Sequence, residues 1–267
     1  MHPTPQQHRE ANLRLFYTPT LLLLTTTLAL AQPVPVHHLE GRTRGFLVVR
    51  DEAGRPIGSG EVNQEAHGDR VTQHVLYRFR DGSVDDETAT FTQRGTFQLV
   101  SDHHIQRGPF FSKPLDLSID DHGQVTTHSV GPDGKTKDET VHIDSEPGLV
   151  NGYLGPIMAN LNPSAPEVKL AMLTPTPKPH MMHLAVTPDG HGSFTLGGLR
   201  HTATIFRLKS ELAGVAGVIA PLVGKEPKDI LIWVVEGDAP VLVRAVGQIS
   251  EGGPVVSIEV AGAIFPH

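Results

Sequence analysis

The sequence predicts a mainly β protein, in which one large antiparallel sheet curves into a half-barrel or folds into a sandwich, with one or two short helices. Short runs of alternating apolar and polar residues recur along the chain, a period that is typical of strands with one buried face. Gly, Pro, Asp and Asn separate these runs, and connectors such as "EGDAP" and "SEGGP" have the length of hairpin turns. Helical periodicity, by contrast, is sparse.

The N-terminal segment has the composition of a secretory signal peptide. Two arginines precede an apolar run, and Ala29 and Ala31 occupy the small-residue positions of a cleavage site. The run is about 10 residues long, shorter than the ~20 that span a bilayer, so at most peripheral membrane contact is expected. We predict a periplasmic or secreted protein with a signal peptide over 1–31, an extended leader over 32–44 and a single β-rich domain over 45–267.

Composition narrows the function classes. The formal net charge is −7, and loss of Arg9, Glu10 and Arg14 with the signal peptide would make it −8. Because nucleic-acid affinity comes from neutralising phosphates with cations, no nucleic-acid partner is expected. The chain has no cysteine, so neither a disulfide framework nor thiol chemistry is predicted. No motif indicates a cofactor.

The alternating runs give the expected strands in chain order. In "VTQHVLYRF" they place Val71, Val75, Tyr77 and Phe79 on one side. The stretch "DEAGRPIG" is interpreted as a turn, and Ser59 and Ser193 as turn residues. Strands are expected at 45–50, 71–79, 84–91, 96–105, 113–119, 124–130, 137–144, 167–173, 181–187, 192–197, 200–208, 230–235, 240–249 and 254–265.

Two segments are candidates for short helices. The first covers 150–161, with Asn151 as N-cap and Pro163 beyond its end. The second covers 211–224 and contains "LAGVAGVIAPLV", twelve residues without a polar side chain. This apolar stretch is interpreted either as a buried element that plugs the core, or as a mobile lid over a ligand cavity or a loop that contacts lipid.

The triplet "DHH" raises the question of a metal or hydrolytic site. On a strand, Asp102 and His104 point to one face and His103 to the other. The preferred interpretation is a half-buried His103 opposite a solvated edge that carries Asp102 and His104. The alternative is a metal-assisted hydrolase that uses Asp102 and His104 with ligands from adjacent strands, since a zinc site needs at least three protein ligands.

A second acidic group lies in "SVDDET". Alternation places Asp85 and Glu87 on one face and Asp86 on the other. Because these residues follow a tight turn, they are expected to be solvated. The remaining histidines are expected to form hydrogen bonds rather than to bind metal. No nucleophile motif such as G-x-S-x-G is present in the sequence.

The order of the elements resembles a known group of proteins. The chain has an early "RPIGSGEV" strand entry, a long antiparallel region, the pair "WVVEGDAPVLVR" with Trp233, Gly237, Pro240 and Arg244, and a closing "GPVVSIEV" strand. This pattern resembles uncharacterised bacterial periplasmic β-rich proteins of the lipoprotein-localisation carrier type. The resemblance implies an incomplete barrel around an apolar cavity closed by short helices.

We therefore expect an exported, non-enzymatic protein that binds a lipid or other apolar ligand inside the barrel. The expected lining residues are Phe79, Phe97, Leu99 and Trp233, and the expected lid residues are Val218, Ile219 and Leu222. Besides the metal-assisted hydrolase, a cell-envelope assembly or adhesion module that binds an unidentified protein partner is a further alternative.

Overall fold

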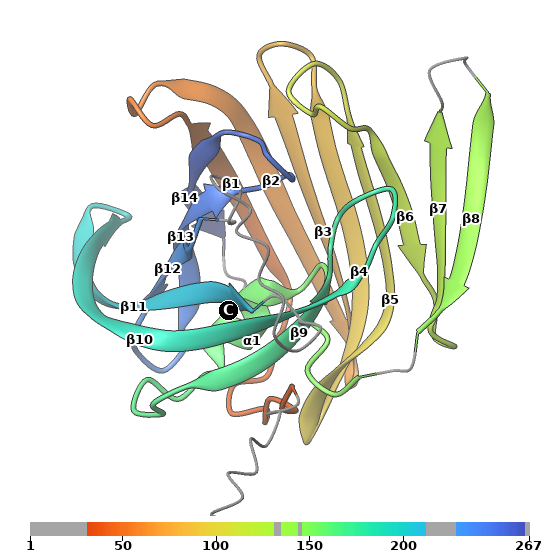
Figure 1. The fold of residues 1–267 in the computed structure, drawn as a ribbon. Helices are drawn as coiled ribbons and strands as arrows, with labels where there is room; N and C mark the ends of the chain where they lie inside the picture. Colours follow the sequence, from red (N-terminus) through yellow and green to blue (C-terminus); the bar gives the residue numbers. More distant parts are fainter. Residues whose placement is uncertain (1–30, 131–134, 144–145, 212–227, 265–267) are drawn as a thin grey trace, which may run out of the picture.

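The fold is one curved antiparallel sheet, seen in a computed structural model that describes residues 31–130, 135–143, 146–211 and 228–264 (Figure 1). The sheet has 14 strands, and one short helix, α1 (Leu154–Ala159), lies among the described residues. The strands are β1 (Thr43–Arg50), β2 (Pro56–His67), β3 (Arg70–Phe79), β4 (Val84–Arg94), β5 (Thr96–Arg107), β6 (Leu115–Ile119), β7 (Gln124–Val130), β8 (Thr136–His142), β9 (Val168–Leu173), β10 (Met181–Leu196), β11 (Leu199–Glu211), β12 (Ile230–Val235), β13 (Val241–Gln248) and β14 (Val255–Ile264).

The topology consists of two meanders that share one sheet. Strands β1 to β8 follow each other in order, strands β9 to β14 do the same, and β1 pairs with β14 to join them. The two edges of the sheet are therefore β8 and β9, which are consecutive in the chain. The sheet curls without closing, so the prediction of a large, curved antiparallel half-barrel is confirmed.

The alternating pattern missed strand β2, although the resemblance placed a strand entry at "RPIGSGEV", and the glycines of this strand explain why. The predicted turn "DEAGRPIG" ends in β2, and Ser59 lies within this strand rather than in a turn. A Cβ on Gly60 would lie 2.5 Å from the Tyr77 ring, so the glycine makes room for an aromatic side chain of the neighbouring strand. Ser193 also lies in a strand, because the two runs predicted at 181–187 and 192–197 form the single strand β10.

The helix is shorter than predicted. It covers six residues, and Asn151 does not cap it. Instead, the Asn151 side chain accepts a hydrogen bond from the Leu173 backbone N–H and donates one to the Leu173 carbonyl oxygen. Asn151 therefore fixes the approach to the helix against edge strand β9. The second predicted helix lies, apart from Glu211, outside the described residues.

The leader packs against the sheet and the helix. The Val34 side chain is buried in the main core with Phe97, and the Phe97 backbone N–H donates to the Val34 carbonyl. Further along, the Asn160 side chain, just after α1, accepts hydrogen bonds from the backbone N–H groups of His37 and His38. These contacts tie the leader and α1 to one end of the curved sheet.

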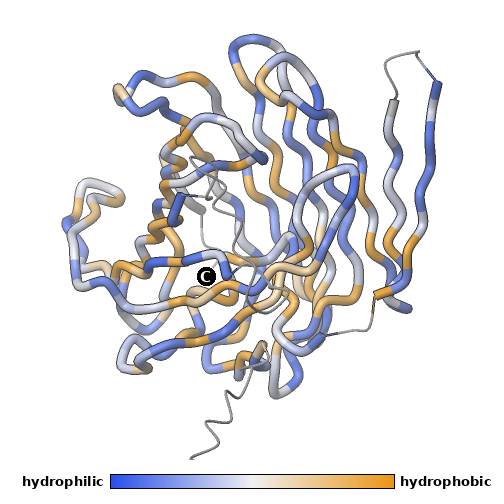
Figure 2. Tube along the Cα trace, in the orientation of Figure 1, coloured by the Kyte–Doolittle hydropathy of each residue, from blue (hydrophilic) through white to orange (hydrophobic). Residues whose placement is uncertain are grey.

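Hydropathy alternates along the strands, as the period-2 pattern predicts (Figure 2). The main core contains α1 and the facing side chains of both meanders, including Phe91, Tyr153 and Leu208. The Phe91 and Tyr153 rings stack with their centroids 4.6 Å apart. This core fills one end of the half-barrel and leaves the remaining interior available for a cavity.

Candidate functional site: an interior cavity with two unlike walls

The concave side of the sheet encloses a cavity of about 2080 Å³. Small-molecule pockets usually have volumes of about 300–1,000 Å³, so this interior has room for a lipid-sized molecule. Strands of both meanders, the leader and the residues around α1 contribute to its lining.

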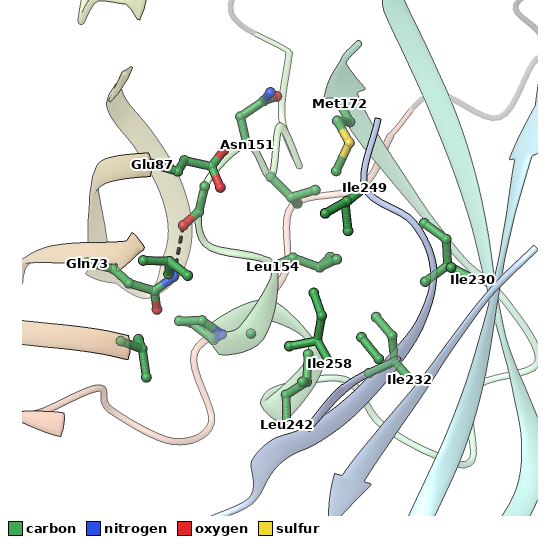
Figure 3. A pocket seen from close by; sticks show the side chains of 18 of the residues that line it. Gln73, Glu87, Asn151, Leu154, Met172, Ile230, Ile232, Leu242, Ile249 and Ile258 are labelled. Carbon is green, nitrogen blue, oxygen red and sulfur yellow. Dashed lines mark hydrogen bonds between the residues drawn. The ribbon is translucent and has the colours of Figure 1, made fainter. Parts of the chain in front are cut away.

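One wall of the cavity is aliphatic. It is built by strands β12, β13 and β14, whose inward positions carry Ile230, Ile232, Leu242, Ala245, Val256 and Ile258. Ile232 is fully buried, whereas Ile230, Leu242 and Ile258 are half-buried because they border the open space. These side chains face Gln73 and Glu87 across the cavity (Figure 3).

The opposite wall is polar and comes from β3, β4 and β5. The strand register aligns these inward side chains in rungs that run across the three strands. One rung is Val75–Glu87–His104, and the next is Tyr77–Asp85–Gln106. All of these residues except Gln106 line the cavity.

A β-bulge explains why Asp102 and His104 point inward. Thr90 pairs with Ser101 and Phe91 with Leu99, so Val100 has no partner and the alternation of β5 shifts there by one residue. As a result, Phe97 and Leu99 share the inner face with Asp102 and His104. The prediction of a solvated Asp102/His104 edge was wrong, because Asp102 is 2% exposed and His104 is 9% exposed. It is His103 that faces outward, where its Nε2 lies 3.0 Å from Asp116 Oδ1.

The prediction that Asp85 and Glu87 are solvated was also wrong. Asp85 is buried, and Glu87 is half-buried on the cavity wall. Alternation itself was correct, because Asp86 lies on the outer face and pairs with His74 at 2.9 Å. The three strands bury this rung because their inner face is covered by the far wall of the half-barrel.

His104 is held between two carboxylates. Its Nε2 lies 2.8 Å from Asp85 Oδ1, and its Nδ1 lies 3.5 Å from Glu87 Oε1. Burial alone lowers the pKa of His104, but the charges of Glu87 and Asp85 more than offset it and raise this pKa to about 10. The imidazole is therefore a cation at neutral pH, and neither ring nitrogen is available as a base or a metal ligand.

Asp85 is hydrogen-bonded through both of its carboxyl oxygens. Its second oxygen accepts a hydrogen bond of 2.9 Å from the Gln106 amide, which also donates to the Ile249 carbonyl oxygen. Glu87 has a different environment from Asp85. Burial raises the pKa of Glu87, the charge of His104 opposes this shift, and the charge of Asp85 adds to it. In the described part of the chain, no hydrogen bond reaches the Glu87 carboxylate, and His104 is its ion-pair partner.

Asp102 lies on the same inner face, next to the Glu87–His104 pair, but is not itself a lining residue of the cavity. Neither of its carboxyl oxygens has a hydrogen-bond partner among the described residues. Burial and the nearby Glu87 raise the pKa of Asp102 well above its usual value, although His104 opposes the shift. The Asp102 Oδ1 lies close to Gly152, a cavity-lining residue with a φ of 71°, where a Cβ would be 2.7 Å from that oxygen.

The structure places the predicted ligand-binding residues away from the cavity. Phe97 and Leu99 pack in or against the main core. Phe79 stacks on Phe110 with ring centroids 4.2 Å apart, in a separate cluster. Trp233 points to the outer face, where the Arg244 guanidinium lies 4.8 Å from its ring centroid. None of these four residues lines the cavity. The predicted lid residues Val218, Ile219 and Leu222 lie outside the described residues.

The metal-assisted alternative requires a group of three ligands. Across residues 31–264, apart from the gaps in the description, no three His, Asp or Glu side chains are arranged to hold a metal ion. Asp102 and His104 share a face, but His104 is bonded to carboxylates on both sides. The described residues therefore provide no ligand set for this mechanism.

Most of the remaining histidines that have a charged partner form single pairs with carboxylates. Examples are His128 with Asp138 at 2.8 Å and His183 with Glu146 at 2.9 Å. These pairs agree with the expectation that the histidines form hydrogen bonds.

Comparisons with known proteins give no family for the chain. No protein-family model matches it, and no curated protein matches it. A search of solved structures finds a crystal structure described as "a putative lipoprotein from Parabacteroides distasonis ATCC 8503", with a TM-score of 0.34 and 10% sequence identity, covering 87% of this chain and 100% of that one. The resemblance to the lipoprotein-localisation carriers thus stays a prediction from the sequence. No helix in the described ranges is long and apolar enough to cross a membrane.

Proposed function

We propose that this is an exported protein that binds a lipid or another apolar molecule in the interior of its half-barrel. The observation that supports the proposal is the cavity of about 2080 Å³ with an aliphatic wall on β12 to β14. An enclosed apolar surface of this kind gains free energy by removing ligand surface from water, at roughly 25 cal/mol per Å². An alkyl chain of the ligand that buries ~300 Å² would contribute ~7 kcal/mol to the binding free energy before the costs of association.

The chemistry of the polar wall also favours binding over catalysis. A general base works best when its pKa is near the operating pH and when it can reach its substrate. His104 meets neither condition, since both its ring nitrogens face carboxylates and its pKa is about 10.

The test has two parts. The full-length protein is purified without detergent, extracted with organic solvent and examined by lipid mass spectrometry. Its thermal unfolding is then followed with increasing decanol, because a ligand that binds only the folded state raises the midpoint. We expect a co-purified apolar molecule or a saturable rise in the midpoint. Empty protein whose midpoint ignores decanol would overturn the proposal.

The assembly or adhesion module is a rival outcome of the same experiment. A protein that carries no lipid, does not respond to decanol and retains a stable protein partner through purification would support that function instead.

A further inference from the structure

The two walls of the cavity differ in charge as well as in polarity. The aliphatic wall carries Ile230, Leu242 and Ile258. Among the described residues of β12, β13 and β14 that line the cavity, none has a charged side chain. The opposite wall carries Asp85, Glu87 and His104 within one connected group. A ligand that fills the cavity must therefore meet an apolar surface on one side and a charged group on the other.

The charge of that group is negative. The group consists of two carboxyl side chains, Asp85 and Glu87, around one imidazole, His104, so its acidic groups outnumber its basic one. Glu87 is the excess acidic group, and it is half-buried and lines the cavity. His104 Nδ1 lies 3.5 Å from Glu87 Oε1, whereas His104 Nε2 lies closer to Asp85, at 2.8 Å from its Oδ1.

The cations at the mouth of the cavity already have partners. Lys113 Nζ lies 2.8 Å from Glu251, and Arg42 pairs with Glu65 at 3.4 Å. Lys228 pairs with Glu52 at 3.6 Å. None of these exposed pairs includes Glu87 or another residue of the polar wall.

A second, independent observation is the Asp102 carboxyl, which has no hydrogen-bond partner among the described residues although it is buried. It lies on the inner face next to the Glu87 rung and approaches Gly152, a lining residue. Asp102 does not line the cavity itself, but Glu87 does, and no hydrogen bond from a described residue reaches the Glu87 carboxylate either. This side of the cavity therefore contains more hydrogen-bond acceptors than the described protein groups satisfy. A buried acceptor in this state costs free energy, and a donor from a ligand would recover part of it.

We propose that the ligand is an amphiphile with a protonated amine head, which binds Glu87 while its apolar part lies against β12 to β14. This inference rests on the proposed function, and it adds the chemical class of the ligand. An ammonium group supplies both the positive charge and the hydrogen-bond donors that the polar wall lacks. A carboxylate head of the same length would be repelled by Glu87 and Asp85.

Three probes of equal chain length test the proposal by isothermal titration calorimetry at pH 7, below their aggregation concentrations: decylamine, decanol and decanoate. We expect decylamine to bind at least about tenfold more tightly than decanol, and decanoate to bind most weakly. Equal affinities for the three, or a preference for decanoate, would overturn the amine head but leave apolar binding intact. Failure of all three to bind would overturn the proposed function itself.

The variant Glu87→Gln removes the charge and keeps the shape. We expect it to lose the advantage of decylamine over decanol, while its affinity for decanol changes less than about threefold. Asp86→Asn is the matched control, since Asp86 is the adjacent residue on the outer face. It should keep the preference for decylamine. If Glu87→Gln does not fold, the order of the three probes on the wild-type protein still decides the question.

Discussion

The two meanders enclose the same cavity with opposite chemistry. Strands β12 to β14 present aliphatic side chains, whereas β3 to β5 present Asp85, Glu87 and His104. An apolar wall alone would be enough to hold a lipid chain, and folding would then bury no charged groups on this side of the cavity. The polar wall buries charges, whose desolvation makes them a poor source of stability. Under the proposed function, this charged cluster serves ligand binding rather than folding.

The largest expected effect comes from removing the counter-charge of His104. Asp85→Ala leaves a buried imidazolium without its closest partner, which should lower the free energy of unfolding by about 3–5 kcal/mol. Urea unfolding followed by circular dichroism measures it. Asp86→Ala, at the adjacent outward position, should cost less than about 1 kcal/mol. Similar losses of unfolding free energy for both variants would contradict a buried, closely paired Asp85 on the inner wall.

The next effect concerns the Gly152 position beneath the polar wall. Gly152→Ala places a side chain at a φ of 71° and forces it against Ala89 and Asp102. We expect a loss of about 2–3 kcal/mol from the combined backbone strain and overpacking. Gly54→Ala is the matched control, because Gly54 has a similar φ of 77° with open space around it and should show the backbone part alone. Equal losses for the two variants would exclude close packing at Gly152.

A change of one pH unit is expected to have a smaller effect on stability. The pKa of His104 is raised to about 10 in the folded protein, so its contribution to stability is complete below about 6.5, the ordinary value. Stability should then fall as pH rises towards 10, by at most about 1.4 kcal/mol for each pH unit from this one group. Urea unfolding at pH 7, 8 and 9 measures the slope. His104→Gln should flatten it and His103→Gln should keep it; an unchanged slope in His104→Gln would contradict the ion-pair arrangement.

The smallest effect tests whether the aliphatic wall borders open space. Leu242 lines the cavity, whereas Leu208 is 1% exposed in the main core. Because Leu242 already has open space on one side, Leu242→Ala should cost about 1 kcal/mol, against about 3–4 kcal/mol for Leu208→Ala. Thermal and urea unfolding compare the two variants. Equal losses would indicate that the interior is filled rather than hollow.

The sequence was sufficient to predict much of the fold but not the site. Period-2 patterning identified most strands, because alternation reports directly on which face is buried. It missed β2, where Gly58 and Gly60 make room for the aromatic rings of Phe79 and Tyr77 and leave no apolar period of their own.

The candidate site escaped prediction for two physical reasons. The bulge at Val100 shifts the phase of β5, so extrapolation from Phe97 put His104 on the wrong face. Glu87 and His104 lie on β4 and β5, and the turn between these strands sets their pairing register. No local sequence pattern specifies that register. The available signal was Glu87 and His104, which stand in register across the β4–β5 hairpin.

The most direct measurement of apolar binding uses the neutral fluorescent probe N-phenyl-1-naphthylamine. We expect saturable one-to-one fluorescence enhancement that decanol displaces, weakened at least about tenfold by Ile230→Asp, which puts a charge on the aliphatic wall. Leu231→Asp, the next residue on the outer face of β12, should bind the probe normally. Fluorescence that never saturates, or that is the same in both variants, would contradict a ligand inside the half-barrel.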